Sequence, residues 1–190
     1  MQSRTDIIIG NINGKILDVG FTCGTLHEKL IEKFSRENIF GIDIEVKNKN
    51  EFDVEGSAED LPFKENFFDS IVAGELTEHL NNPDLFVKES QRVLKKGGKL
   101  ILTTPNRDSL INRLFKSYHA PAHLSLFNFS ELKKLLEKNG FVIDFYCCFP
   151  YTSESNYGSK FSFFFPFRNL IHFLLPKSLQ ENMVLVCTKN

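Results

Sequence analysis

The chain has 190 residues, of which 42% are hydrophobic, and its formal net charge is −1. This length suits one domain with a buried core, and we expect a single domain over residues 1–190 with insertions at about 106–129 and 149–181. The near-neutral charge gives no strong signal for nucleic-acid binding. The four cysteines form no CxxC pair or metal-finger spacing, and no signal segment or transmembrane segment is recognised, so we expect a cytoplasmic protein without a bound metal.

An apolar strand at residues 15–19 runs into a glycine-containing turn and then into a helix. The strand carries Asp18 near its end, and Gly20 and Gly24 lie in the turn. A second strand ends in Asp43. In open parallel sheets, ligands bind beyond the carboxyl ends of the strands, and an acid about 20 residues after a glycine turn commonly holds ribose hydroxyls. These two strands therefore predict a site for a nucleoside cofactor.

Strands alternate with helices along most of the chain, which indicates a doubly wound α/β sheet. The second strand covers residues 39–43, and only about eight residues separate it from the next extended piece near residues 52–55. A parallel crossover helix usually needs about a dozen residues. We therefore expect the second crossover helix to be short or missing. Further strands are predicted at residues 67–73, 100–104, 141–148 and 183–188.

The glycine spacing in the first turn bears on which cofactor binds. A dinucleotide site needs Gly-x-Gly-x-x-Gly, because the second glycine lets the backbone approach the pyrophosphate. Thr22 stands at that place, and no Gly-Lys-Ser/Thr sequence follows it to cradle phosphates. An NAD-dependent oxidoreductase is therefore the least favoured function.

Six motifs follow one another between residues 12 and 145: Leu17-Asp18-Val19-Gly20-x-x-x-Gly24, Gly41-Ile42-Asp43, Ala58-Glu59-Asp60-Leu61-Pro62-Phe63, Phe68-Asp69-Ser70-Ile71-Val72, Glu75-Leu76-Thr77-Glu78-His79-Leu80, and Arg92 to Leu100. In this order and spacing they resemble the class I methyltransferases that use S-adenosyl-L-methionine, especially the small-molecule branch with quinone-biosynthesis and natural-product enzymes. The resemblance implies a methyltransferase with a Rossmann-like fold, whose mostly parallel seven-stranded sheet has an antiparallel last strand.

The same resemblance assigns the cofactor site to ten residues: Asp18, Gly20, Phe21, Thr22, Gly24, Asp43, Ile44, Ser57, Ala58 and Gly74. In this assignment, the backbone from Gly20 to Gly24 cradles the methionine end of S-adenosylmethionine, and Asp18 orients its ammonium group. Asp43 accepts hydrogen bonds from the ribose hydroxyls. Ser57 and the residue after it lie against the adenine edge.

Two residues depart from the pattern of the family. The family usually has a second glycine where Thr22 stands and an aspartate where Ser57 stands. A serine hydroxyl is a weaker acceptor than a carboxylate, so we expect weaker cofactor binding than in a typical member. An alternative function is therefore a non-catalytic S-adenosylmethionine-binding module that acts with a partner subunit.

Candidate catalytic residues follow the fourth and fifth strands, at the edge of the sheet that faces the methyl group. His79 is a candidate general base because histidine side chains titrate near neutral pH, and the alternative is a helix-entry histidine bonded to the backbone. His123 is a second candidate, with a structural hydrogen bond as its alternative. The sequence lacks the Asn/Asp-Pro-Pro-Tyr/Phe clamp that resembling enzymes use on planar amino groups. We therefore expect an oxygen or carbon atom of a small molecule as the acceptor.

The segment 161–175 is rich in phenylalanine and leucine but is too short and too interrupted to span a membrane. Its residues between two prolines fall at helical spacing. We consider four roles: a helix packed on the domain, a roof over an apolar acceptor, a homodimer contact, or a peripheral helix on lipid. Because Arg107, Arg113 and Lys116 would lie near the same rim, an amphiphilic acceptor with an anionic group is a further hypothesis.

Overall fold

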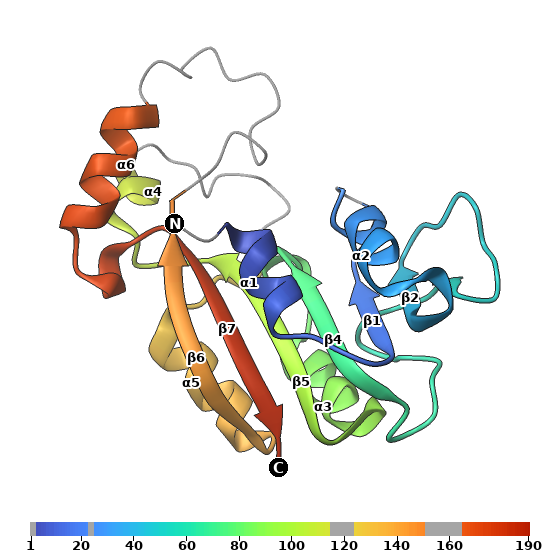
Figure 1. Ribbon diagram of the computed structural model, residues 1–190. Helices are drawn as coiled ribbons and strands as arrows, with labels where there is room; N and C mark the ends of the chain where they lie inside the picture. Colours follow the sequence, from blue (N-terminus) through green and yellow to red (C-terminus); the bar gives the residue numbers. More distant parts are fainter. Residues whose placement is uncertain (1–2, 23–24, 115–123, 151–164) are drawn as a thin grey trace.

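The computed structural model describes residues 3–22, 25–114, 124–150 and 165–190. Its centre is a seven-stranded sheet with the strand order β3-β2-β1-β4-β5-β7-β6 (Figure 1). The strands are β1 (Ile16–Val19), β2 (Ile39–Asp43), β3 (Asp53–Glu55), β4 (Phe68–Gly74), β5 (Leu94–Pro105), β6 (Phe141–Phe149) and β7 (Asn182–Lys189). The first five strands pair in parallel, whereas β7 is antiparallel to both β5 and β6. The prediction of a mostly parallel sheet with an antiparallel last strand is confirmed.

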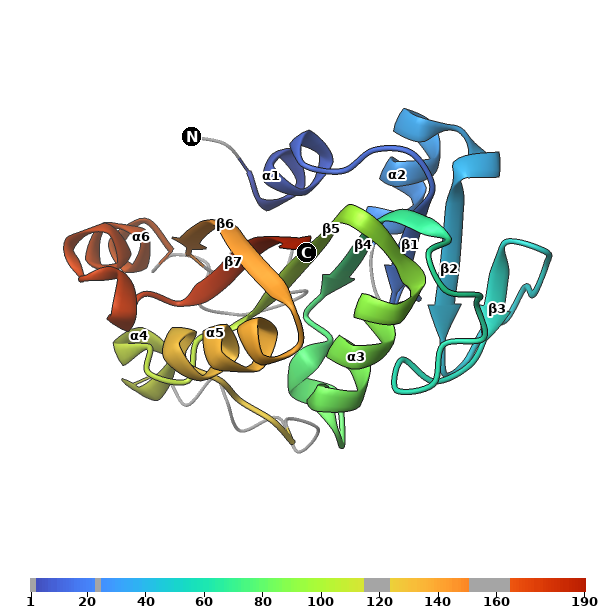
Figure 2. The ribbon, with the colours of Figure 1, turned by 90° about the horizontal axis from the view of Figure 1, so that it is seen from below.

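Helices cover both faces of this sheet. They are α1 (Arg4–Gly10), α2 (Leu26–Phe34), α3 (Pro83–Val93), α4 (Leu110–Leu114), α5 (Phe129–Lys138) and α6 (Phe165–Leu174), with the 3₁₀ turns η1 (Arg36–Asn38), η2 (Thr77–His79) and η5 (Lys177–Leu179). Figure 2 shows α1 and α2 on one face, and α3 and α5 on the other. The fold is therefore doubly wound, with its core on both sides of the sheet.

The local sequence explains where α5 begins and which side it buries. The Asn128 side chain accepts the N–H of Glu131 at 3.0 Å, and the Glu131 carboxylate accepts the N–H of Asn128 at 3.2 Å. This reciprocal cap satisfies donors that the first helical turn would otherwise leave open. Leu132 and Leu136, four residues apart on one side of the helix, are both fully buried.

Residues 44–52 join β2 to β3 without a helix, which confirms that the second crossover helix is missing. In the sheet, Val19 of β1 pairs with Ile42 of β2 on one side and with Ala73 of β4 on the other. The carboxyl ends of these three parallel strands therefore meet at one edge. The loops that follow them gather there, and the strand ends and loops together hold most of the residues that the sequence assigned to the cofactor.

Candidate functional site

A carboxylate follows β2, and the loop after β1 fixes its orientation. Oδ2 of Asp43 accepts a hydrogen bond from the Thr22 backbone N–H at 3.0 Å and another from the Thr22 hydroxyl at 2.7 Å. Oδ1 of Asp43 accepts the N–H of Ile44 at 2.7 Å. A carboxylate offers about four lone-pair positions, so these three donors leave room on Oδ1. The half-buried Asp43 is held rigidly and can still accept a hydrogen bond from a hydroxyl.

The turn after β1 depends on glycine. Gly20 has a φ of +78°, a conformation that residues with a side chain rarely adopt. A Cβ at this position would also lie 3.0 Å from Cδ1 of Leu76, in the loop after β4. The N–H of Gly20 donates to the Ile42 carbonyl at 2.9 Å. Gly20 therefore joins the ends of β1 and β2 while the β4 loop packs closely against it.

Two segments assigned to the cofactor, at Ile44 and at Ser57 with Ala58, differ in exposure. Ile44 is 80% exposed although it directly follows the strand that ends at Asp43. Ala58 is buried in the core, whereas Ser57 is exposed and its hydroxyl oxygen accepts the N–H of Glu59 at 3.1 Å. The Ser57 hydroxyl oxygen thus stabilises its own turn, and its O–H group can still donate a hydrogen bond to another acceptor. Ile44 presents an uncovered apolar surface beside the carboxylate.

A network of ionisable side chains lies beside this turn, and no sequence motif predicted it. His27, at the start of α2, places Nδ1 3.2 Å from the Asp18 carboxylate and Nε2 3.2 Å from Asp53 of β3. The side chain of Arg36 pairs with Asp53 as well. The His27 ring also lies against Phe21, with 4.4 Å between ring centroids. The Asp18 carboxylate, predicted to face the ammonium group, is therefore engaged by His27.

The pKa values of the two carboxylates in this network shift in opposite directions. Burial raises the pKa of Asp18, and the hydrogen bond from His27 only partly opposes that shift. At Asp53, burial also raises the pKa, but hydrogen bonds from Arg36 and Asn50 outweigh it and leave the pKa below its usual value. Burying a carboxylate costs free energy unless it is paired. The contacts of His27 with both carboxylates offset part of that cost.

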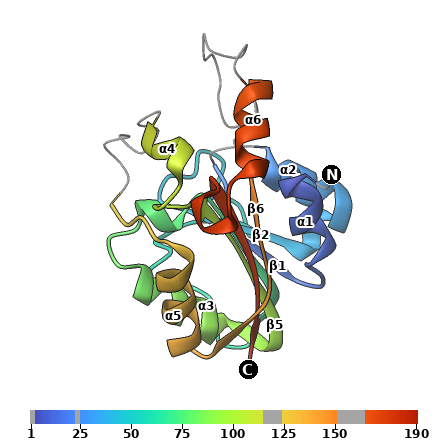
Figure 3. The same ribbon diagram turned by 90° about the vertical axis from the view of Figure 1, so that its left-hand side faces the viewer.

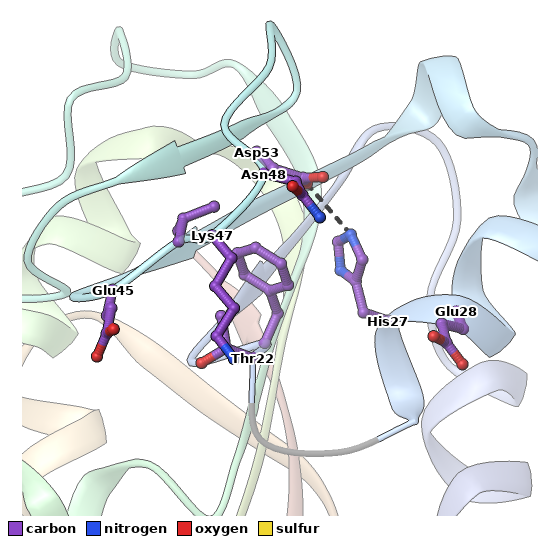
Figure 4. A pocket seen from close by; sticks show the side chains of 9 residues that line it. Thr22, His27, Glu28, Glu45, Lys47, Asn48 and Asp53 are labelled. Atoms are coloured by element: carbon purple, nitrogen blue, oxygen red, sulfur yellow. Dashed lines mark ion pairs between the residues drawn. The ribbon is translucent and has the colours of Figure 1, made fainter.

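A cavity of about 730 Å³ opens on the α2 side of β2 and β3 (Figure 4). The residues around it are Phe21, Thr22, His27, Glu28, Glu45, Val46, Lys47, Asn48 and Asp53. They come from the loop after β1, the start of α2, the helix-free connection between β2 and β3, and the start of β3. The cavity therefore lies where a second crossover helix would pack, which leaves this side of the site open.

Two acids follow β4, of which Glu75 is half-buried and Glu78 is fully buried. Glu75 has a φ of +53°, its N–H donates to the Thr103 carbonyl at 2.8 Å, and its carboxylate lies 3.5 Å from the Arg4 guanidinium of α1. Glu78 is 1% exposed and accepts a hydrogen bond from the Thr104 hydroxyl at 3.0 Å. Burial, followed by the nearby charge of Glu75, raises the pKa of Glu78 to about 8. Glu78 therefore keeps its proton at neutral pH.

The predicted catalytic histidines are placed only in part. His79 is exposed at the end of η2, just beyond the carboxyl end of β4, and its backbone N–H donates to the Leu76 carbonyl at 2.9 Å. His123 and Gly24 lie outside the described residues, as does Lys116. Arg107, expected at the same rim, forms an ion pair with Glu131 at 2.8 Å.

A family model described as a methyltransferase domain matches residues 9–144 of the chain. The chain belongs to this methyltransferase family. A ubiquinone biosynthesis O-methyltransferase from Pelagibacter ubique is 33% identical over 117 residues, which cover 56% of this chain and 45% of that protein. The chain spans less than half the length of the first curated relatives that it matches.

Solved structures share the fold of this methyltransferase domain. A SAM-dependent methyltransferase from Archaeoglobus fulgidus matches with a TM-score of 0.70 at 20% identity, over 98% of this chain and 91% of that one. The complex between the Haloferax volcanii Trm112 methyltransferase activator and a methyltransferase matches with a TM-score of 0.67 at 14% identity, over 92% and 82%. The predicted class I methyltransferase fold is confirmed. S-adenosylmethionine is the cofactor of the family, and a relative from Mycolicibacterium smegmatis named a probable S-adenosylmethionine-dependent methyltransferase is 33% identical over 96 residues, which cover 47% of this chain and 34% of that protein. The NAD-dependent alternative gains no support.

The residues at the strand ends fit that cofactor. S-adenosylmethionine has a ribose diol, which needs an acceptor, and an adenine, which needs an apolar contact. Asp43 has a lone pair available on Oδ1, and the bare Ile44 side chain follows it directly. The turn at Gly20, which has a positive φ, brings backbone N–H and C=O groups to the same edge. The methionine carboxylate requires a cation, and the Arg4 guanidinium lies beside Glu75 at the end of β4.

Proposed function

We propose that this methyltransferase domain transfers the methyl group of S-adenosylmethionine to an oxygen or carbon atom of a small acceptor. The observation that carries the proposal is the fixed Asp43 carboxylate at the end of β2, beside the exposed Ile44. A rigid acceptor at this place suits a ribose hydroxyl. The four cysteines form no CxxC pair, which fits a reducing compartment and supports the cytoplasmic location expected from the sequence.

In this proposal each strand end has its own part in holding the cofactor. Asp43 accepts a ribose hydroxyl, Ile44 contacts the adenine, and Arg4 pairs with the methionine carboxylate. The backbone from Gly20 to Thr22 and the end of β4 at Gly74 surround the methionine portion. The cofactor supplies a methyl group that is already activated on a sulfonium, so the protein must mainly align the acceptor and exclude water.

A hydroxyl acceptor also needs a group that takes its proton. We assign this role to His79, because it is exposed directly after β4 and histidine titrates near neutral pH. The neighbouring Glu78 holds its own proton at neutral pH and is buried, which makes it unsuitable as the base. Replacement of His79 by alanine should lower kcat and leave the affinity for the cofactor unchanged.

The acceptor is proposed to be amphiphilic, with an anionic group. Arg113 is exposed on α4, close to the carboxyl end of β5, and exposed leucines stand on either side of it in the helix. The relative from Pelagibacter ubique is named for ubiquinone biosynthesis, and quinone precursors combine an apolar part with a polar ring. This similarity supports an acceptor with an apolar portion.

Isothermal titration with S-adenosylhomocysteine, the demethylated product, tests the cofactor site. Wild-type protein should bind it and should not bind NAD, and Asp43→Ala should weaken binding roughly tenfold or more, because a hydrogen bond to a charged group contributes about 1.5–3 kcal/mol. Glu37→Ala removes an exposed carboxylate from η1 and should change nothing. Equal affinities of wild type and Asp43→Ala would contradict the proposed site.

The second candidate function is a non-catalytic S-adenosylmethionine-binding module that acts with a partner subunit. Thr22, Ser57 and the missing crossover helix favour it, and one structural neighbour was solved in complex with an activator protein. Incubation with methyl-labelled S-adenosylmethionine and a metabolite extract separates the two candidates. Label transferred to a small molecule supports the enzyme, and cofactor binding without any transfer supports the module.

A further inference from the structure

Two helices at one end of the molecule expose large apolar side chains. Leu114 on α4 is 70% exposed and Leu174 on α6 is 77% exposed. Leu110, Leu170 and Phe173 on the same helices are also exposed. Figures 1 and 3 show both helices projecting beyond the carboxyl ends of β5 and β6. We call these five side chains, together with Arg113 and Lys177, the α4–α6 surface.

The charge on the segments that carry this surface has one sign. Residues 109–130 and 155–180 contain no aspartate or glutamate, and they contain five lysine and arginine residues. The other 18 of the 23 basic residues share the rest of the chain with all 24 acids. Arg113 and Lys177 are exposed on the α4–α6 surface. The part of these two segments that the structure describes is thus both apolar and basic.

We propose that the α4–α6 surface binds peripherally to a bilayer that contains anionic lipid. Exposed leucine and phenylalanine side chains on short helices, with lysine or arginine beside them, are the features of an interfacial helix. Anionic headgroups attract the basic groups, and the acyl boundary takes up the apolar ones. Within the described ranges, no helix is long and apolar enough to cross a bilayer. The surface therefore lies on the membrane and does not enter it deeply.

The charge pattern favours lipid over a second copy of the chain. In a twofold dimer, the same patch meets itself, so the basic groups of Arg113 and Lys177 would be brought against the basic groups of the other copy. Neither α4 nor α6 has an acidic residue to pair with them. Anionic headgroups supply the negative charge that α4 and α6 lack.

This surface also bears on the acceptor, a step that rests on the proposed function. The loops after β4 and β5 lie at the same edge of the sheet as α4. A protein bound through the α4–α6 surface therefore presents this edge to the headgroup region. An amphiphilic acceptor partitions into that layer and can reach the site without crossing bulk water.

Vesicle flotation tests the proposal. Vesicles of phosphatidylcholine with about 30% phosphatidylglycerol should carry wild-type protein, and vesicles of phosphatidylcholine alone should carry much less. Binding should fall as the salt concentration rises. Leu174→Glu should lower the partition coefficient roughly tenfold or more, since a buried leucine side chain contributes about 1.5–3 kcal/mol. Lys177→Glu should lower it about fivefold or more, the effect of roughly 1 kcal/mol per basic group.

Two matched controls place the same changes elsewhere. Leu85→Glu alters a 40% exposed leucine on α3, and Lys96→Glu reverses the charge of an exposed lysine near the start of β5. Both should bind vesicles as the wild type does. The proposal would be overturned if the wild type did not bind anionic vesicles, or if Leu174→Glu and Lys177→Glu bound them as well as the wild type does. So would light scattering that shows a dimer lost in Leu174→Glu without any lipid binding. Titration with S-adenosylhomocysteine on the same variants distinguishes this failure from a failure of the proposed function.

Discussion

The Thr22 hydroxyl donates to the Asp43 carboxylate at 2.7 Å, and the Thr22 backbone N–H donates to the same oxygen at 3.0 Å. The family usually has a glycine at this position, which could offer only the backbone donor. The threonine side chain therefore adds a second hydrogen bond that fixes the carboxylate. Thr22, which departs from the pattern of the family, is therefore in direct contact with the carboxylate proposed to bind ribose.

Thr22→Val should loosen Asp43 and weaken the binding of S-adenosylhomocysteine about threefold to tenfold, the effect of losing one hydrogen bond of about 0.5–1.5 kcal/mol. Thr22→Ser keeps the hydroxyl and should restore the affinity. Isothermal titration measures both. If the valine variant bound as tightly as the serine variant, the hydroxyl would have no positioning role.

His27→Ala should destabilise the protein by about 3 kcal/mol, because removal of one partner leaves a buried charge without compensation. Protonation of Asp18, whose pKa burial already raises, can relieve part of this loss at low pH. Denaturant unfolding at neutral pH measures the effect, and the exposed His79→Ala serves as the control. Asp18→Asn combined with His27→Ala should cost less than the sum of the single changes. Additive costs would mean that the two side chains do not interact.

The stability of the fold should depend on pH through Glu78. Its pKa in the folded protein is about 8, above the ordinary 4.5. Between these two pH values, the folded state therefore holds a proton that the unfolded state has already released. Stability should therefore fall as the pH rises through this window, by at most about 1.4 kcal/mol per pH unit. Urea unfolding at pH 5.5, 6.5 and 7.5 should show a shallower fall for Glu78→Gln. The exposed Glu137→Gln should retain the wild-type slope, and a Glu78→Gln slope equal to it would refute the assignment.

Gly41→Ala should destabilise the domain by about 1–3 kcal/mol, as overpacked sites do. A Cβ at this position would lie 2.7 Å from the Phe21 ring and 2.8 Å from Oδ1 of Asp53. At Gly10, by contrast, a Cβ would meet nothing within 4 Å, so Gly10→Ala should be neutral or slightly stabilising. Thermal unfolding of the two variants compares the positions directly, and similar melting temperatures would speak against the close packing at Gly41.

The sequence predicted the sheet because its signals are local. The strand before Gly20, the acid at the end of β2 and the short connection after it each depend on adjacent residues, and all three predictions are confirmed. The site beneath the turn could not be predicted in the same way. His27 meets Asp18 and Asp53 only after α2 and β3 have packed on the sheet, and no periodicity marks such a contact.

Phe21 illustrates the same limit. It was assigned to the cofactor through its place in the glycine turn, and its backbone does lie in that turn. Its ring, however, packs on His27 and under Gly41. Sequence position determines where the backbone of a motif runs, but the direction of a side chain depends on neighbours that are distant in the chain.

The helix-free connection between β2 and β3 changes what holds the edge of this sheet together. Elsewhere in the fold, the apolar sides of amphipathic helices pack on the strands. β3 has only three residues, and it is tied to α2 and η1 through Asp53, His27 and Arg36. Electrostatic attachment responds to salt and to protonation, whereas apolar packing responds far less. Local opening of the molecule should therefore begin at β3, and its amide protons should exchange with solvent sooner, in acid or in concentrated salt, than those of the central strands.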